Sequence, residues 1–287
     1  MKFASFAWPF GLVCATIAVA AFLLHDAKPP VATGLAPAPP PRTWPDYSPG
    51  GAGFKVPAGQ DGPLIGYGYA LITRTFANIG PEVPDRAMRF AGNNLTCQNC
   101  HLDGGTSRHA MPLVGIFKAY PKYSTRDKRV ISLTERLNEC MERSMNGRAL
   151  PDESREMQAL LAFMRYIGDA EAAPAPSAPE APPMAPDTGR GAVVYMTVCA
   201  ACHQPDGLGK RSGSIGDAGG YVFPPLWGPD SFNDGAGMDR YERIVGFVRR
   251  NMPRGVDALH PQLTVQQAWD VSAYVIAQPR PHYRPAR

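Results

Sequence analysis

Apolar residues recur at helical spacing in four segments of this chain, whereas the alternation typical of strands is sparse. Residues 64–78 and 191–198 form the two earlier segments, and residues 151–167 and 264–278 form the two later ones. The pattern predicts an all-α protein in which an early and a late helix occur in each of two successive units.

The segment 264–278, TVQQAWDVSAYVIAQ, has the clearest helix signals. Thr264 occupies the position of an N-cap, and the helical period directs one face toward a core. The residues predicted on that face are Val265, Ala268, Trp269, Ser272, Tyr274 and Val275. Segment 151–167 places acidic residues in its first turn, where the helix dipole favours them.

Proline-rich stretches divide the chain into parts. Residues 26–60 are rich in Pro, Ala and Gly and lack helical periodicity, which predicts a tether. Residues 171–186 (EAAPAPSAPEAPPMAP) predict a semi-rigid linker. Two folded units remain, 61–170 and 187–287, in agreement with a length of 287 residues.

Residues 1–25 resemble an export signal. One lysine precedes an apolar run over residues 3–24, and the tripeptide AVA at 18–20 is a candidate cleavage site. Because the run is long enough to span a bilayer, an uncleaved N-terminal membrane anchor is the alternative. Cys14 lies in this run with poor lipobox surroundings, so we interpret it as a bystander. The net charge of +4 is too small to indicate nucleic-acid binding.

One five-residue arrangement occurs twice, as Cys97-Gln-Asn-Cys100-His101 and as Cys199-Ala-Ala-Cys202-His203. In this motif two cysteines form thioethers to haem and the adjacent histidine is the proximal iron ligand. Two copies in similar surroundings predict two covalently bound haem c groups, each with its iron. Since c-type haem is attached on the outer side of the cytoplasmic membrane, we expect a periplasmic protein.

Other uses of the two cysteine pairs fit poorly. A zinc site built from two such pairs needs them roughly 15–20 residues apart, and here about a hundred residues intervene. A thioredoxin-like motif would lie near a βαβ pattern, which surrounds neither pair. Because a haem fills most of a domain this small, helices packed around it replace a conventional core. The predicted fold is two class I-like cytochrome c domains joined by the Pro/Ala-rich linker.

The sixth ligand of the second iron is predicted from loop position. The resemblance to cytochrome c domains implies a ligand from a loop before the last helix, and Met252 lies 49 residues past His203 and 12 before Thr264. A methionine in that place is typical of electron transfer, because thioether ligation raises the potential. Met238 is the alternative ligand, and we interpret His260 as a loop or cap residue.

The equivalent position in the first unit holds Cys140, 39 residues past His101. An odd cysteine in an exported protein indicates a disulfide to another chain, a reactive thiol or a metal ligand. Arg136 and Arg143 are close in sequence, and their charges favour a thiolate. Thiolate ligation donates electron density to iron, which suits chemistry better than passive electron relay. The alternative is Met145 or Met111 as ligand, with Cys140 a buried apolar residue.

These motifs resemble a known family. The strings CQNCHLDGGT, RDKRVISLTERLNECMERSMNGRAL (126–150) and FPPLWGPDSFND (223–234) are similar to the tetrathionate-forming thiosulfate dehydrogenases. These are periplasmic dihaem cytochromes related to the cytochrome subunit of the Sox sulfur-oxidising complex. The resemblance covers nearly everything from residue 61 to 282.

The resemblance implies a role for several residues. Cys140 would be the axial thiolate of the catalytic haem, and Arg126, Arg136 and Ser144 would line the substrate pocket. The second haem would pass electrons onward. Some members have a lysine before the second-haem methionine, whereas this chain has Asn251, so a ligand switch of that kind is not expected.

The residue chemistry agrees with these implied roles. Guanidinium groups bind the oxygens of a sulfonate well, and Arg136, Cys140 and Ser144 would share one face of a helix over about residues 131–146. Arg126 would approach from the preceding loop. The alternative for both arginines is pairing with haem propionates.

The resulting hypothesis is an enzyme that joins two thiosulfates into tetrathionate. Cys140 either leaves the iron or forms a transient thiosulfonate adduct, and the electrons pass through the second haem to an external cytochrome c or high-potential iron–sulfur protein. Two alternatives are a dihaem electron-transfer cytochrome without its own substrate, and a Sox-type cytochrome that attaches thiosulfate to a carrier protein. Tetrathionate reduction is the same chemistry in reverse.

Overall fold

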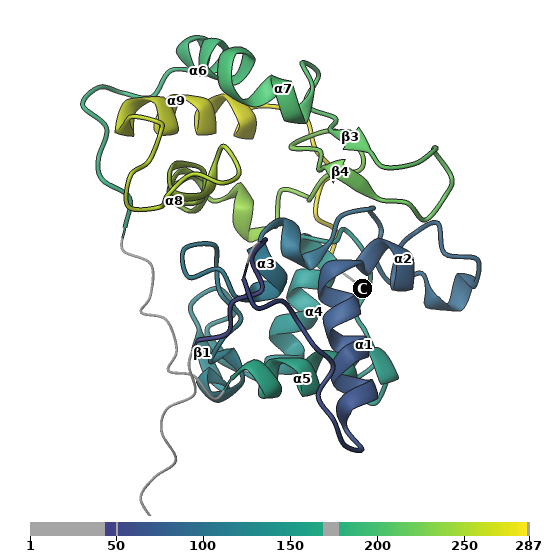
Figure 1. The fold of residues 1–287 in the computed structure, drawn as a ribbon. Helices are drawn as coiled ribbons and strands as arrows, with labels where there is room; N and C mark the ends of the chain where they lie inside the picture. The colour runs from purple at the N-terminus through teal and green to yellow at the C-terminus, as the bar shows by residue number, and fades with distance from the viewer. Residues whose placement is uncertain (1–43, 50, 169–177, 286–287) are drawn as a thin grey trace, which may run out of the picture. The chain divides into compact units, whose positions relative to one another are not determined.

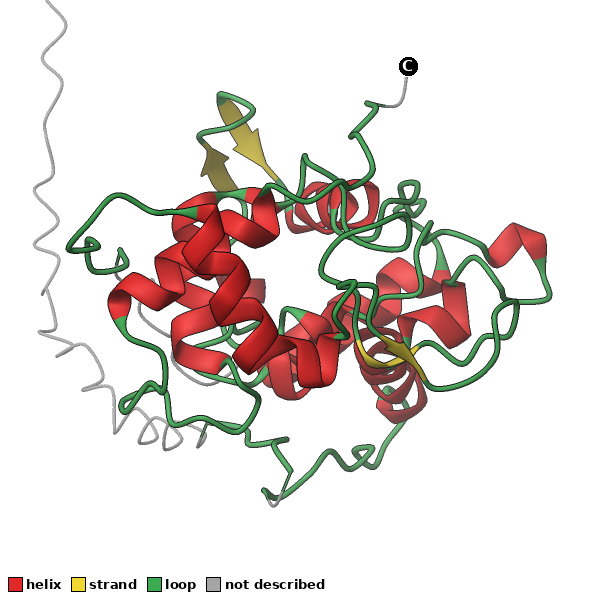
Figure 2. Ribbon diagram, turned by 90° about the horizontal axis from the view of Figure 1, so that it is seen from above, coloured by secondary structure: helices red, strands yellow, loops and turns green. Residues whose placement is uncertain are grey.

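A computed structural model describes residues 44–49, 51–168 and 178–285 of the chain. Helices dominate this part, and its strands are confined to two short antiparallel hairpins (Figure 2). The helices before the linker are α1 (Gly62–Thr73), α2 (Thr75–Ile79), η1 (Arg86–Met88), η2 (Cys97–Asn99), α3 (Leu102–Gly105), η3 (Ile116–Ala119), α4 (Leu133–Arg143) and α5 (Arg155–Ile167). Those after it are α6 (Thr188–Val194), the π-helical η4 (Tyr195–Cys199), α7 (Ala200–His203), η5 (Gly237–Asp239), α8 (Tyr241–Asn251) and α9 (Val265–Ile276). The strands are β1 (Lys122–Ser124), β2 (Arg129–Ile131), β3 (Lys210–Arg211) and β4 (Tyr221–Phe223).

In the first half, α1 packs across α5 (Figure 1). The two helices approach closely at Gly68, where an added Cβ would lie 2.1 Å from the main-chain oxygen of Ala159. Leu71 of α1 and Phe163 of α5 are almost completely buried in the core. Glycine at this crossing therefore lets the early and late helices pack backbone against backbone.

The second half repeats this plan with α6 and α9. An added Cβ on Gly191 would lie 2.1 Å from the main-chain oxygen of Asp270. The buried Asp270 carboxylate also accepts hydrogen bonds from the Asp187 amide at 2.8 Å and from Nε and Nη2 of Arg190 at 2.8 and 2.9 Å. The early and late helices are thus joined by close packing and by a buried carboxylate.

The late helices confirm their prediction from sequence. Thr264 accepts a hydrogen bond from the Gln267 amide as the N-cap of α9. Of the six residues predicted on its core face, Ala268, Ser272 and Val275 are buried and the other three are half-buried. Helix α5 begins only at Arg155, because Ser154 caps it and the preceding residues form a turn.

The early helices differ in detail from their prediction. The predicted helix over 64–78 is interrupted at Arg74, whose φ of −139° and ψ of 48° are not helical. The helix predicted over 191–198 starts earlier, at Thr188, and widens into a π-helical turn, Tyr195–Cys199, that includes the first cysteine of the second motif. That turn carries the chain directly into the second cysteine motif.

Helix α4 is shorter than predicted. Ser132 and Glu135 form a capping box at its start, while Ile131 belongs to β2. Ser144 is the C-cap and keeps helical backbone angles, with φ −70° and ψ −38°. The face that contains Arg136, Cys140 and Ser144 is therefore preserved.

Helix α8 was not among the helices predicted from the sequence. Its buried residues Ile244, Val245 and Phe247 show that the segment is amphipathic. No side chain caps its first turn, because Arg240 occupies the N-cap. A strong start signal is thus missing from the sequence.

Buried asparagines connect segments from the two halves. The Asn93 side chain donates to the carbonyl oxygens of Ser144 at 3.0 Å and Ser231 at 3.1 Å. The Asn233 side chain donates to the carbonyl of Glu142 at 2.9 Å and to Asn146 Oδ1 at 3.1 Å. The described residues from 44 to 285 accordingly form one compact unit in their contacts.

The predicted export segment, most of the predicted tether and the first part of the linker lie outside the described residues. Among the helices that are described, none has the length and apolar character needed to cross a membrane.

Candidate active site

A short turn after α2 positions Cys97, Cys100 and His101. Thr96 and Asn99 form a capping box around this turn. Nδ1 of His101 lies 2.5 Å from the carbonyl oxygen of Met111. Because a carbonyl can only accept, Nδ1 is protonated and the lone pair of Nε2 is left for a metal. Burial lowers the pKa of His101, which favours the neutral ligand form.

The second motif has the same design. Nδ1 of His203 lies 2.8 Å from the carbonyl oxygen of Pro224, so its Nε2 is also free to bind a metal. Burial lowers the pKa of His203 as well. The four motif cysteines, Cys97, Cys100, Cys199 and Cys202, form no disulfides in the described part of the chain. A c-type haem needs two cysteine thiols for its thioether bonds and one imidazole with a free Nε2 for its iron. Both turns provide these groups and therefore fit a c-type haem.

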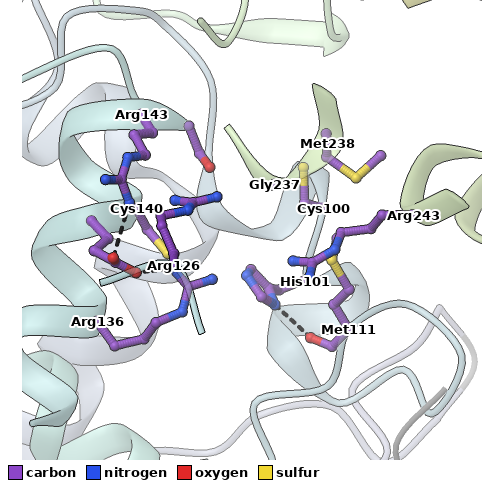
Figure 3. Close-up of a pocket in the computed structure, with 12 residues that line it drawn as sticks. Cys100, His101, Met111, Arg126, Arg136, Cys140, Arg143, Gly237, Met238 and Arg243 are labelled. Atoms are coloured by element: carbon purple, nitrogen blue, oxygen red, sulfur yellow. Dashed lines mark hydrogen bonds and ion pairs between the residues drawn. The ribbon is translucent and has the colours of Figure 1, made fainter. Parts of the chain in front are cut away.

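Cys140 and His101 lie on facing sides of one cavity (Figure 3). Helix α4 contributes Cys140, and the first motif contributes Cys100 and His101. The cavity is lined by Cys100, His101, Met111, Arg126, Arg136, Glu139, Cys140, Arg143, Ser144, Gly237, Met238 and Arg243. The structure therefore brings together the four residues that the sequence suggested for catalysis, Arg126, Arg136, Cys140 and Ser144.

Arginines give this cavity a strongly positive character. Arg126, from the β1–β2 turn, and Arg136, from α4, extend into it with Arg243 from α8 (Figure 3). Electrostatic attraction to Cys140 is the main cause of a raised pKa of Arg136. Burial, followed by repulsion from Arg143 and Arg240, lowers the pKa of Arg126. The arrangement suits a small anion held next to a sulfur atom.

Two lining residues were missed at the level of sequence. Glu139 bridges Arg136 at 2.8 Å and Arg143 at 2.9 Å, which orients both guanidinium groups. Arg243 comes from α8, and burial followed by repulsion from Arg136 lowers its pKa. The apolar periodicity of residues 241–251 was the signal that could have placed Arg243 on a helix.

The alternative methionine and histidine ligands occupy different places. Met238 lines the first cavity together with Cys100 and His101, whereas Met252 follows α8, half-buried against the core. Met111 lines the first cavity and its carbonyl accepts from His101. Met145 is buried in the core, and His260 is an exposed loop residue bonded to Asp257 at 2.6 Å.

Comparison with known proteins agrees with two cytochrome domains. The family model described as SoxA/TsdA, cytochrome c domain, matches residues 88–169, and the model described as cytochrome c matches residues 189–277. A thiosulfate dehydrogenase of Allochromatium vinosum is 38% identical over 242 residues, which cover 81% of this chain and 84% of the relative. The chain belongs to the thiosulfate dehydrogenase family. A second member, from Stutzerimonas stutzeri, is 36% identical over 79% of this chain and 73% of its own length.

A solved structure supports membership in the thiosulfate dehydrogenase family. The thiosulfate dehydrogenase TsdBA from Marichromatium purpuratum, in its as-isolated form, matches with a TM-score of 0.68 and 33% identity. The match covers 79% of this chain but 48% of the other, so this chain spans about half the length of that protein. The fold prediction of two class I-like cytochrome c domains is confirmed. Two such domains imply two covalent c-type haems, which the two cysteine turns fit.

Proposed function

We propose that this chain is a thiosulfate dehydrogenase, which oxidatively joins two thiosulfates into tetrathionate. The observation that carries the proposal is the placement of Cys140 and His101 on facing sides of one arginine-lined cavity. Four thiosulfate dehydrogenases are 32–38% identical to the chain, which supports the same activity. The reverse reaction, tetrathionate reduction, uses the same groups.

Arg126 and Arg136 hold the first thiosulfate. Their planar guanidinium groups donate parallel hydrogen bonds to sulfonate oxygens. Glu139 orients Arg136 through an ion pair of 2.8 Å between Nη1 of Arg136 and Oε2 of Glu139. Ser144 lies one turn beyond Cys140 and adds a hydroxyl donor to the same wall. The bound anion then presents its outer sulfur atom to Cys140.

Cys140 has two roles in this proposal. Cys140 and His101 would hold the iron of the first haem. The Cys140 thiolate also forms a transient S–S bond to the outer sulfur of the first thiosulfate, and the two electrons released pass to the haems; the second thiosulfate then attacks that outer sulfur and the Cys140 thiolate leaves. A haem held by these residues would supply an electron acceptor for the reaction. The protein contributes the positive cavity that holds two repelling dianions close together.

The second unit carries electrons away. We assign residues 61–170 to a catalytic cytochrome domain and 187–287 to an electron-transfer domain, joined by residues 171–186. His203 and Met252 would hold the second iron, and the position of Met238 in the first cavity supports that choice. The final acceptor is an external cytochrome c or a high-potential iron–sulfur protein.

Export places the enzyme with these acceptors. We assign residues 1–25 to a signal or N-terminal anchor and residues 26–60 to a tether, and the mature protein to the periplasm. The two covalent haems support this location, because their attachment takes place outside the cytoplasmic membrane.

A Cys140→Met variant tests the function. Both haems should still attach, since Cys97, Cys100, Cys199 and Cys202 are intact, while thiosulfate oxidation with ferricyanide should fall at least about 100-fold. The wild-type protein alone should be active, which separates the proposal from a plain electron carrier and from a Sox-type enzyme that needs a carrier protein. Full turnover by the variant with two haems attached would show that Cys140 is not catalytic.

A further inference from the structure

A second cavity adjoins the first and shares two of its arginines. Arg126 and Arg143 line both cavities. The second cavity is completed by Asp234, Gly235, Ala236, Asp239, Arg240 and Tyr283. A ligand in the first cavity and a ligand in the second would therefore both approach the same guanidinium groups.

The two carboxylates of this cavity are already paired with other groups. Asp234 accepts hydrogen bonds from the Tyr283 amide and from Nδ1 of His282, both at 2.7 Å. Asp239 pairs with Nε of Arg280 at 3.3 Å. These acids are not partners of the arginines that line the cavity.

The arginines, in contrast, are crowded and incompletely neutralised. Repulsion from Arg143 and Arg240 adds to burial in lowering the pKa of Arg126. Neither Arg126 nor Arg240 has an ion pair with an acidic residue in the described part of the chain. Arg143 is held by Glu139 at 2.9 Å and stacks on the Tyr283 ring at 4.8 Å. A bound anion would relieve this repulsion.

We propose that the second cavity binds the second sulfonate of the reaction, with Arg240 and Arg126 as its main contacts. The inference rests on the proposed function, because joining two thiosulfates produces a dianion with a sulfonate at each end. Three successive S–S bonds of about 2 Å separate the two sulfonate sulfur atoms, a span of at most about 6 Å. Adjacent cavities with a shared arginine wall match such a ligand.

The atoms and electrons of the coupling reaction balance with a second sulfonate bound in this subsite. Overall, each thiosulfate loses one electron and one S–S bond forms between the two outer sulfur atoms. The transient bond to Cys140 is broken again, and neither a proton nor an oxygen atom is exchanged. The two electrons leave through the haems to ferricyanide in the assay or to the external acceptor. Arg240 touches only the far sulfonate, so it positions the second substrate and one end of the product.

An Arg240→Gln variant of the haem-loaded protein tests the subsite. Loss of a charge-assisted contact should raise the KM for tetrathionate reduction about tenfold. Inhibition by 1,2-ethanedisulfonate should weaken by a similar factor, while inhibition by methanesulfonate should stay unchanged. Arg240→Lys keeps the positive charge but not the planar guanidinium group, so its KM and its inhibition by the disulfonate should lie between those of the wild type and Arg240→Gln. This variant also tests the subsite if Arg240→Gln folds poorly.

The matched control is Arg284→Gln, which removes an exposed charge one residue after Tyr283 and lines neither cavity. It should leave KM and disulfonate inhibition at wild-type values. The inference would be overturned if Arg240→Gln left the KM for tetrathionate and the inhibition by 1,2-ethanedisulfonate unchanged. It would also be overturned if the variant shifted the potential of the first haem without changing KM, and Arg240 would then be assigned to another partner. A wild-type protein that does not oxidise thiosulfate would instead defeat the proposed function, whereas disulfonate binding followed by calorimetry still measures the subsite directly.

Discussion

Gly68 in α1 lies so close to Ala159 in α5 that an added Cβ would be 2.1 Å from the Ala159 carbonyl oxygen. Gly191 meets Asp270 at the same distance in the second half. In both places the early and late helices of a cytochrome c domain cross backbone to backbone. The two halves thus share one way of packing an early helix against a late one.

Alanine at either crossing should be strongly destabilising. Gly68→Ala and Gly191→Ala must push two helices apart, and we expect each to lower the free energy of unfolding by about 3 kcal/mol or more. Denaturant unfolding of the haem-loaded protein, followed by circular dichroism, measures the change. Gly246→Ala is the control, because an added Cβ there meets nothing within 4 Å in the middle of α8. It should be neutral or stabilise by up to about 1 kcal/mol, and equal losses in all three variants would contradict the packing argument.

The Asp270 carboxylate should contribute stability that depends on pH. Burial alone would raise the pKa of Asp270, but hydrogen bonds from Arg190, the Asp187 amide and Gln266 outweigh it and hold the pKa below the usual value. The stabilisation is therefore complete above the unfolded pKa of about 4 and is lost as the pH falls through the folded value. Asp270→Asn should cost about 2–4 kcal/mol at pH 7 and should flatten the acid limb of a stability–pH curve. An acid limb identical to that of the wild type would assign the acid sensitivity to other carboxylates.

The sequence predicted the cavity-lining residues of α4 better than those that reach the first cavity from elsewhere in the chain. Arg136, Cys140 and Ser144 follow one another at helical spacing, so local periodicity sufficed to place them on one face. Arg243 could not be placed in this way, because α8 lacks a capping side chain and reaches the cavity through tertiary packing. The bonds of Asn93 and Asn233 join residues far apart in the chain, up to 138 positions for Asn93 and Ser231. No local pattern encodes such contacts.

Helix boundaries also depend on tertiary contacts that the local sequence pattern does not encode. The 3.6-residue period predicted one helix over 64–78, but Arg74 interrupts it because packing against the first cysteine turn takes precedence there. Thr75 shows this competition, since its hydroxyl donates to the Leu71 carbonyl at 2.6 Å and accepts from the Cys97 amide at 3.1 Å. The helix break thus supports the turn that holds Cys97.

Arg136→Gln should reduce kcat/KM for thiosulfate by about 100-fold. The loss of a half-buried guanidinium removes paired hydrogen bonds to the sulfonate and leaves Glu139 with one cation instead of two. Steady-state assays with ferricyanide measure the effect. Arg129→Gln is the matched control on the neighbouring strand β2, where an exposed arginine pairs with Glu135 at 2.6 Å. It should remain within about twofold of the wild type, and similar losses in both variants would indicate that general charge, not Arg136, draws the anion.

Replacing the sixth ligand should identify which methionine serves the second haem. Thioether ligation raises the potential of a haem, so Met252→Ala should lower the potential of the higher-potential haem in a spectroelectrochemical titration. Met238→Leu conserves volume in the first cavity and should leave that potential unchanged. Thiosulfate binding at the first cavity should persist in Met252→Ala, while electron delivery to the external acceptor slows, because the substrate groups lie around Cys140. If Met238→Leu lowered the higher potential and Met252→Ala did not, Met238 would be the ligand and the second unit would need a loop arrangement different from the one described.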